Sequence, residues 1–298
     1  MRTEDPGLYD YLPYYDRPKI AWPNGARLAF WCAPNIEHYE LDPPLNPSRT
    51  PWPRPVPDVL HYAWRDYGNR VGLWRIFDMM DEFGAPMSHN TNSTALEYHP
   101  EILERIKKRG DELIGHGRTN SERQSGMSEE DEKGLIEECT AMLKRLAGKA
   151  PRGWMGPWMA ETYLTADLLK EAGYEYLLDW PCDDQPFWFR TRSGPILEIP
   201  YPLEVNDSPA MLARRHTARE FKEMVIDQFD EMLEQSRKQP LVCGIVLHSF
   251  IAGQPFRLRP LREAIKHILG HREDIWLTTP GEIATYCMSL PKGTIPGG

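Results

Sequence analysis

The chain has 298 residues, of which 41% are hydrophobic and 27% charged, and a formal net charge of −9, a composition typical of a globular protein. No apolar run approaches the ~20 residues of a membrane-spanning helix, and lysine and arginine do not form the basic stripe of a nucleic-acid-binding protein. From the polar, acidic start we expect no secretory or transit signal, and the five cysteines lack any CxxC pair. We expect a cytoplasmic protein with reduced thiols that binds neither membranes nor nucleic acid.

Apolar, strand-like runs alternate with amphipathic, helix-like runs along most of the chain. The predicted strands cover residues 27–34, 86–90, 112–116, 153–156, 174–180, 196–201, 241–248 and 275–278. The predicted helices cover residues 69–84, 97–110, 128–148, 165–172, 218–239, 261–269 and 281–288. Consecutive parallel strands need a crossover, usually a helix. The alternation therefore predicts one α/β domain over residues 1–298, built as a barrel of seven or eight parallel strands.

One segment interrupts this alternation, at about residues 41–68. It contains seven prolines from Pro43 to Pro57. Proline fixes φ and removes a hydrogen-bond donor, so we predict an extended excursion without strand or helix. The excursion starts where the first strand ends, so it could be a linker, a cap over the barrel mouth or a subunit contact. Together with the aromatic N-terminus it suggests a homo-oligomer.

Polar residues follow the predicted strands where these end. Glu37 and His38 follow the first strand, His116 ends the third, and His248 ends the seventh. In parallel α/β barrels these strand ends share one face, which carries the active site. A lone histidine there is usually a surface residue, but three on separate strands beside a glutamate make coincidence less probable.

Two kinds of chemistry fit such a face. A carboxylate beside an imidazole can activate water while a second imidazole protonates a leaving nitrogen. Alternatively, two histidines with a third ligand and a water can form a hydrolytic zinc site. The chain has no GxSxG segment and no cysteine in a nucleophile signature, so hydrolysis by activated water is favoured over covalent catalysis.

Six segments, in this order, resemble the motifs of the polysaccharide deacetylase (NodB-homology) superfamily, most closely its allantoinase-like and cyclic-imide-hydrolase-like branch. They are NIEHY (35–39), HGRTN (116–120), PRGWMGPWMAET (151–162), DWPCDDQPFWF (179–189), IPYPLEVND (199–207) and LHSFIAGQPFRLRPL (247–261). The resemblance covers residues from about 27 to 288 and implies a distorted (β/α) barrel. Single motifs are weak, but their order and spacing make the match specific.

The resemblance implies roles for individual residues. Glu37 matches the family's general base and His248 its catalytic acid. His38 and His116 match metal ligands, but Asn120 stands where the family's H-x-x-x-H motif has its second histidine. A zinc-like divalent metal on His38, His116 and Asn120 and a metal-free site therefore both remain open. The residues expected to bind substrate are Arg118, Trp154, Trp158, Asp183 and Asp184, with Phe187 and Trp188 as further pocket walls.

The main hypothesis is a hydrolase of a non-peptide C–N bond in a small, cyclic amide, imide or ureide. The alternative is a metal-dependent carbohydrate de-N-acetylase acting on N-acetylglucosamine-type substrates. A third hypothesis is a silent barrel that serves as a binding scaffold. The altered metal ligands are its only support, and the retained Glu37 and His248 argue against it.

Overall fold

The computed structural model describes residues 7–43 and 56–298. Its centre is a curled sheet whose strands follow the order β6-β7-β5-β4-β3-β2-β1-β8, with β9 paired to the start of β1. The strands are β1 (Leu28–Ile36), β2 (Ser88–Thr91), β3 (Glu112–Gly115), β4 (Gly153–Trp154), β5 (Tyr176–Leu177), β6 (Phe187–Phe189), β7 (Ile196–Glu198), β8 (Leu241–His248) and β9 (Ile275–Leu277). All pairings are parallel except that of β6 with β7. The predicted fold class is confirmed, and each predicted strand has its counterpart.

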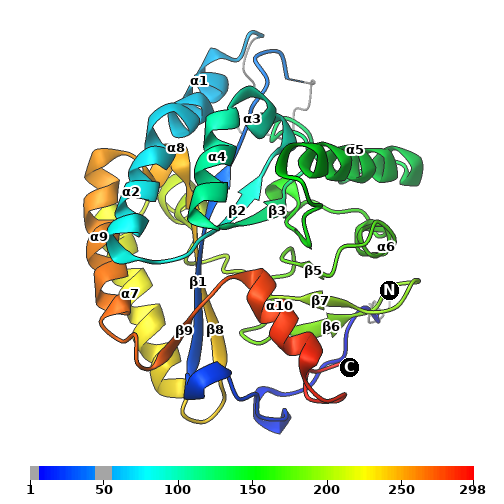
Figure 1. Ribbon diagram of the computed structural model, residues 1–298, viewed down its shortest axis with the longest axis vertical. Helices are drawn as coiled ribbons and strands as arrows, with labels where there is room; N and C mark the ends of the chain where they lie inside the picture. Colours follow the sequence, from blue (N-terminus) through cyan, green and yellow to red (C-terminus); the bar gives the residue numbers. More distant parts are fainter. Residues whose placement is uncertain (1–6, 44–55) are drawn as a thin grey trace.

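The sheet is built around β1 and β8, which lie side by side in the middle of the molecule (Figure 1). Every residue of both strands is buried, as expected for parallel strands covered on both faces. The register pairs Asn35 with His248, so the C-terminal ends of the two strands are level. This register places the residues that follow β1 beside the last residue of β8.

The strand missed by the sequence analysis is β6. We expected its DDQPFWF segment to lead into pocket walls, whereas Phe187 and Phe189 pack in the core on β6. The chain ends cover its edge: the amide of Arg190 donates to the carbonyl of Leu8, and that of Trp188 donates to Pro296. Figure 1 shows the C-terminus close to β6. An edge strand covered in this way is protected from pairing with other chains.

The helices are α1 (Val59–Tyr67), α2 (Leu73–Phe83), α3 (Ser93–Tyr98), α4 (Pro100–Arg109), α5 (Glu129–Ala147), α6 (Thr165–Glu171), α7 (Ala218–Gln235), α8 (Ser249–Ala252), α9 (Pro255–Leu269) and α10 (Pro280–Ser289). Several start at a side-chain cap: Ser128 caps α5, and Thr217 forms a capping box with Glu220 at α7. Helices α7 and α9 lie together on one flank of the sheet (Figure 1). No helix among the described residues is long and apolar enough to cross a membrane.

One prediction about the proline-rich excursion is wrong. We expected no helix in residues 41–68, but α1 forms there after the last proline. The side chain of Asp58 accepts from the amide of His61 as its N-cap, and Trp64 donates its indole N–H to the carbonyl of Phe250. The cap and this tertiary contact are favourable where no proline interferes. Residues 44–55, with most of the prolines, lie outside the described residues.

Candidate active site

Three side chains form a hydrogen-bonded row at the C-terminal end of the sheet. They come from the residue after β1, the last residue of β8 and the segment before η5 (Pro209–Ala213). Glu37 Oε1 lies 3.3 Å from Nε2 of His248, and Nδ1 of His248 lies 2.7 Å from Oδ1 of Asp207. The amide group of Asn35 lies 3.0 Å from the same Nε2. Glu37 is 3% exposed and His248 is 9% exposed, so the imidazole lies between two carboxylates almost out of contact with solvent.

The charges of this row follow from its contacts. Burial alone would raise the pKa of Glu37, but the hydrogen bond and charge of His248, together with Arg65, hold that pKa at about 2. Burial opposes a charge on His248, yet Asp207 and Glu37 outweigh it and raise the pKa of His248 to about 9. At neutral pH the site therefore holds an ionised carboxylate beside a protonated imidazole, which are the states of a base and an acid.

His116 contributes a neutral imidazole to the same site. Its Nδ1 lies 2.5 Å from the carbonyl of Met155, so Nδ1 carries the proton and Nε2 is left with a lone pair. Burial lowers the pKa of His116, although the charge of Glu37 opposes this. Among the described residues its Nε2 has no hydrogen-bond partner. A buried acceptor of this kind is suited to hold a water or a substrate N–H.

Arg65 is a candidate site residue that was not predicted from the sequence. Its Nε lies 3.3 Å from Oε2 of Glu37, and its guanidinium packs over the rings of Tyr39 and Phe250 at 4.9 and 4.6 Å. It is 7% exposed, and its Nη1 has no hydrogen-bond partner in the described part of the chain. We predicted no helix at this position, so no periodicity pointed to Arg65. The capping pattern of Asp58 before α1 was the signal available in the sequence.

Asparagine side chains connect the loops that follow β1, β2 and β3. Asn92 accepts from the backbone N–H of His38 at 2.8 Å, and its own amide group donates to the carbonyl of His116 and to Oδ1 of Asn120. Gly117 has φ +65°, and a β-carbon there would lie 2.7 Å from Pro157. Glycine is therefore needed at the turn that carries the chain away from His116.

The structure does not bring His38 to the row. Its ring packs 5.0 Å from that of Tyr98 and 6.1 Å from that of Tyr62, and it lines a separate cavity of about 520 Å³. Arg65 and Asn69 line the same cavity, and Asn69 donates to the backbone carbonyl of Glu37 at 2.9 Å. This cavity is thus the space next to the row, with Arg65 as the wall between them.

The ligand atoms available near the row do not fit a divalent metal held by His38, His116 and Asn120. His38 faces the tyrosines, and Oδ1 of Asn120 accepts from Asn92. The two oxygens of Glu37 face a guanidinium and an imidazolium, whose charges would repel a cation. The Nε2 of His116 is a buried lone pair without a hydrogen-bond partner in the described part of the chain, and a single such atom does not make a metal site. These residues therefore do not form a divalent-metal site together.

Of the residues expected to bind substrate, Trp158 lies at the C-terminal end of the sheet, as the row does. It follows β4, is 41% exposed, and donates its indole N–H to the carbonyl of Asn120 at 3.0 Å. Its φ of +66° is unusual for a large side chain, and such backbone strain is concentrated at functional sites. Trp154, by contrast, is fully buried and packs edge-on against Tyr174, so it belongs to the core.

Arg118, Asp183 and Asp184 do not reach the row. Arg118 pairs with Glu122 and Glu138 on the surface of the molecule. The carbonyl of Asp184 accepts from the amide of Val242, near the start of β8, whereas His248 ends that strand. The six steps along β8 from Val242 to His248, at about 3.3 Å each, place the two aspartates roughly 20 Å from the row. The chain turns back after the short strand β5, which is why they lie at the opposite end.

A buried group of carboxyls lies at the C-terminal ends of β5 and β7, and it was not predicted. Asp179 accepts from the amide of Gly156 at 2.8 Å, and Glu198 accepts from the amide of Trp180 at 3.1 Å. Burial, the charge of Asp179 and other nearby carboxylates raise the pKa of Glu161 and of Glu198. Burial raises the pKa of Asp179 to about 7. These buried carboxyl groups thus keep their protons at pH values where ordinary carboxyl groups are ionised.

This group predicts how stability depends on pH. Between about pH 4 and 7 the folded chain holds a proton on Asp179 that the unfolded chain releases, so the free energy of unfolding falls as pH rises through this window. We expect Asp179→Asn, which resembles the protonated form, to flatten this fall, with a gain of about 1–4 kcal/mol over wild type at pH 8. Urea unfolding at pH 5 to 8 measures it, with the surface change Glu138→Gln as control. Parallel curves for Asp179→Asn and wild type would contradict the assignment.

The chain is similar to known deacetylases and to an allantoinase. Residues 62–177 match the model of the family described as "Polysaccharide deacetylase". The chain is 27% identical to a putative polysaccharide deacetylase of Schizosaccharomyces pombe, over 88% of this chain and 91% of the other. The crystal structure of Puue allantoinase is 26% identical and superposes with a TM-score of 0.80, covering 93% of this chain and 97% of that one. A probable polysaccharide deacetylase from Pseudomonas aeruginosa PAO1 is 25% identical, with a TM-score of 0.81 and coverage of 91% and 94%.

Proposed function

We propose that this chain, which carries a polysaccharide deacetylase domain and is a hydrolase of carbon–nitrogen bonds other than peptide bonds, acts on a small, cyclic amide, imide or ureide. The observation that supports this proposal most is the row of Glu37, His248 and Asp207. It offers a base and an acid in contact, both nearly closed off from solvent. The similarity to Puue allantoinase over 93% of the chain adds support, since that protein's name refers to a cyclic ureide.

In the proposed reaction Glu37 accepts a proton from water as the water oxygen bonds to the substrate carbonyl carbon. The lone pair of His116 Nε2 accepts the other hydrogen of that water and directs its attack. The free Nη1 of Arg65 donates to the oxygen that becomes negative. His248 then gives its Nε2 proton to the departing nitrogen, and the C–N bond breaks. A cyclic substrate opens to one product that carries both a carboxylate and an amide or amine.

The protonation states of Glu37 and His248 favour this series of proton transfers. Glu37 is a weak base while His248 is charged, because the imidazolium contributes to holding the pKa of Glu37 at about 2. When His248 loses its proton to the leaving nitrogen, that charge disappears and Glu37 retains the proton taken from water more firmly. Base and acid therefore exchange protonation states together, and bulk water restores both after product release.

The surroundings favour a small substrate over a polymer. Glu37, His116 and His248 are each at least nine-tenths buried, so a long chain of sugars could not lie across them without rearrangement. The adjoining cavity of about 520 Å³ has Tyr62, Tyr98 and His99 among its lining residues. Pockets of this size normally enclose small molecules.

A substrate screen tests the proposal. We expect the purified chain to open one of a panel of cyclic imides and ureides, including allantoin, with loss of ring absorbance and appearance of one new carboxylate by mass spectrometry. N-acetylglucosamine oligomers are the matched alternative substrates, scored by acetate release. Turnover of the oligomers without any ring opening would replace the proposal by the carbohydrate de-N-acetylase, which the similarity to the Schizosaccharomyces pombe protein favours.

Two expectations about the setting remain predictions. We propose that the chain works in the cytoplasm as a homo-oligomer. The exposed Tyr11 and Tyr15, which are 87% and 81% accessible near the N-terminus, are the kind of side chains that a subunit contact would bury. Light scattering of the full chain measures the number of subunits.

A further inference from the structure

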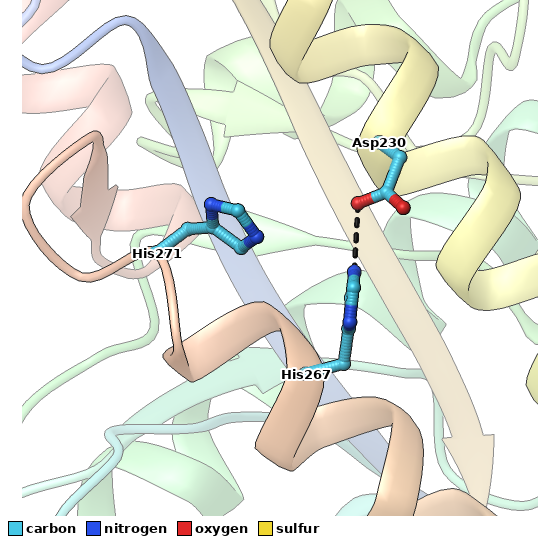
Figure 2. A group of neighbouring side chains, drawn as sticks. All are labelled: Asp230, His267 and His271. Atoms are coloured by element: carbon cyan, nitrogen blue, oxygen red, sulfur yellow. Dashed lines mark hydrogen bonds and ion pairs between the residues drawn. The ribbon is translucent and has the colours of Figure 1, made fainter.

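A cluster far from the active site combines two imidazoles and a carboxylate. Asp230 on α7 faces His267 in the last turn of α9 and His271 just after that helix. Figure 2 shows the three side chains directed toward one another across the gap between the two helices. Nε2 of His267 lies 2.7 Å from Oδ1 of Asp230, and the three ligand atoms all lie within 4.8 Å of one another. From this geometry we propose that the cluster binds a zinc-like transition-metal ion.

The distances suit such an ion. Ligand atoms at about 2.0–2.2 Å from tetrahedral zinc lie about 3.4 Å apart, a value between the shortest and longest separations of this cluster. Rotations of the two imidazoles and the carboxylate would bring all three to that separation, with water as the fourth ligand. Two imidazoles with one carboxylate select zinc, nickel, cobalt or copper over calcium and magnesium, which prefer oxygen.

The surroundings hold the ligands in place. The ring of Phe229 lies 6.2 Å from that of His267 and 5.6 Å from that of His271, so both imidazoles pack against one buried side chain. Nδ1 of His271 lies 3.9 Å from a carboxylate oxygen of Asp274, which leaves Nε2 as its metal-binding atom. A carboxylate behind a ligating histidine is a common feature of metal sites.

Nearby positive charges do not compete for Asp230. The cluster lines a shallow cavity of about 550 Å³ that also contains Arg27 and Arg237. Arg27 pairs with Asp274 at 2.8 Å, and Arg237 pairs with Glu234 at 3.0 Å. Each guanidinium thus has its own carboxylate, and Asp230 is left for the imidazoles and an ion.

The position of the cluster indicates a structural role. Arg27, which shares its cavity, precedes β1, whereas Glu37 follows that strand. The nine residues of β1 at about 3.3 Å each place the two sites roughly 30 Å apart. A bound ion would connect α7 to the turn that leads from α9 into β9. It would stabilise this end of the molecule without touching the substrate.

Titration of the chelator-treated full chain with Zn²⁺ and Co²⁺ tests the inference. We expect one tightly bound ion per chain by calorimetry, visible d–d absorption of tetrahedral Co²⁺, and a rise in Tm of about 5 °C at a Zn²⁺ concentration of about 100 Kd. His271→Ala and Asp230→Asn should each weaken binding by at least about 10-fold and abolish the rise in Tm. His216→Ala, which changes a histidine two residues before the start of α7, should behave as wild type.

Two results would overturn the inference. One is binding and a shift in Tm that are unchanged in His271→Ala and in the double variant His267→Ala/His271→Ala, which would place the ion elsewhere. The other is no bound ion in the wild-type chain. Circular dichroism of each variant without metal shows that it is folded, and these half-exposed side chains can be truncated with little cost to the fold. Since the measurements use no substrate, they are independent of the proposed function.

Discussion

Glu37→Gln is expected to lower kcat for the ring-opening reaction by about 10³-fold or more, because the amide cannot accept the proton of the attacking water. The change keeps the shape of the side chain but leaves Arg65 without its buried counter-charge and His248 with that of Asp207 alone. Turnover is measured with the ring-opening substrate under saturation, and urea unfolding is measured alongside. Glu122→Gln, which alters a surface partner of Arg118, is the matched control.

A second variant separates catalysis from charge compensation. Glu37→Asp retains the carboxylate near Arg65 and His248 but withdraws it by one methylene. If Glu37 were only a counter-ion, the aspartate would restore both stability and turnover. If Glu37 is the base, stability should return while kcat stays low, since proton transfer depends on the position of the accepting oxygen. Near-normal turnover in both Glu37→Gln and Glu37→Asp would refute the role.

The second large effect concerns Asp207, which was not among the residues assigned a role from sequence. Wild-type kcat/KM should stay level at neutral pH and decline above about pH 9, where His248 loses its proton. In Asp207→Asn the carboxylate that faces Nδ1 is gone, so the pKa of His248 should fall by about 1–3 units. The decline should then begin near pH 7, and activity at pH 8 should drop about 10–100-fold and recover as pH is lowered.

The shape of this pH profile distinguishes positioning from mere structural support. A variant that only loosened the fold would lose activity at every pH and would not regain it at pH 6. The control Glu204→Gln changes an exposed carboxylate three residues away that pairs with Arg214. Its profile should match that of wild type. An Asp207→Asn profile with an unshifted basic limb would show that Asp207 does not control the proton of His248.

Local patterns in the sequence predicted the order of most elements and the face that carries the candidate site. Buried parallel strands need continuous apolar runs, and these runs marked the end of β8 correctly and that of β1 to within two residues. Parallel strands align these ends, so a glutamate and two histidines far apart in the chain could be placed together in advance. The order of the motifs pointed to the deacetylase superfamily for the same reason, since each motif follows a strand.

Which side chains meet at this face depends on the packing of the whole chain. His38 follows Glu37 directly, yet adjacent residues point to different sides, and its ring lies among the tyrosines of the neighbouring cavity. Arg65 reaches Glu37 from a helix 28 residues later, through a segment whose prolines concealed that helix. Asp183 and Asp184 lie at the far end of the sheet because the chain reverses after β5. Side-chain direction and chain reversal depend on packing between distant segments, which no local pattern of residues specifies.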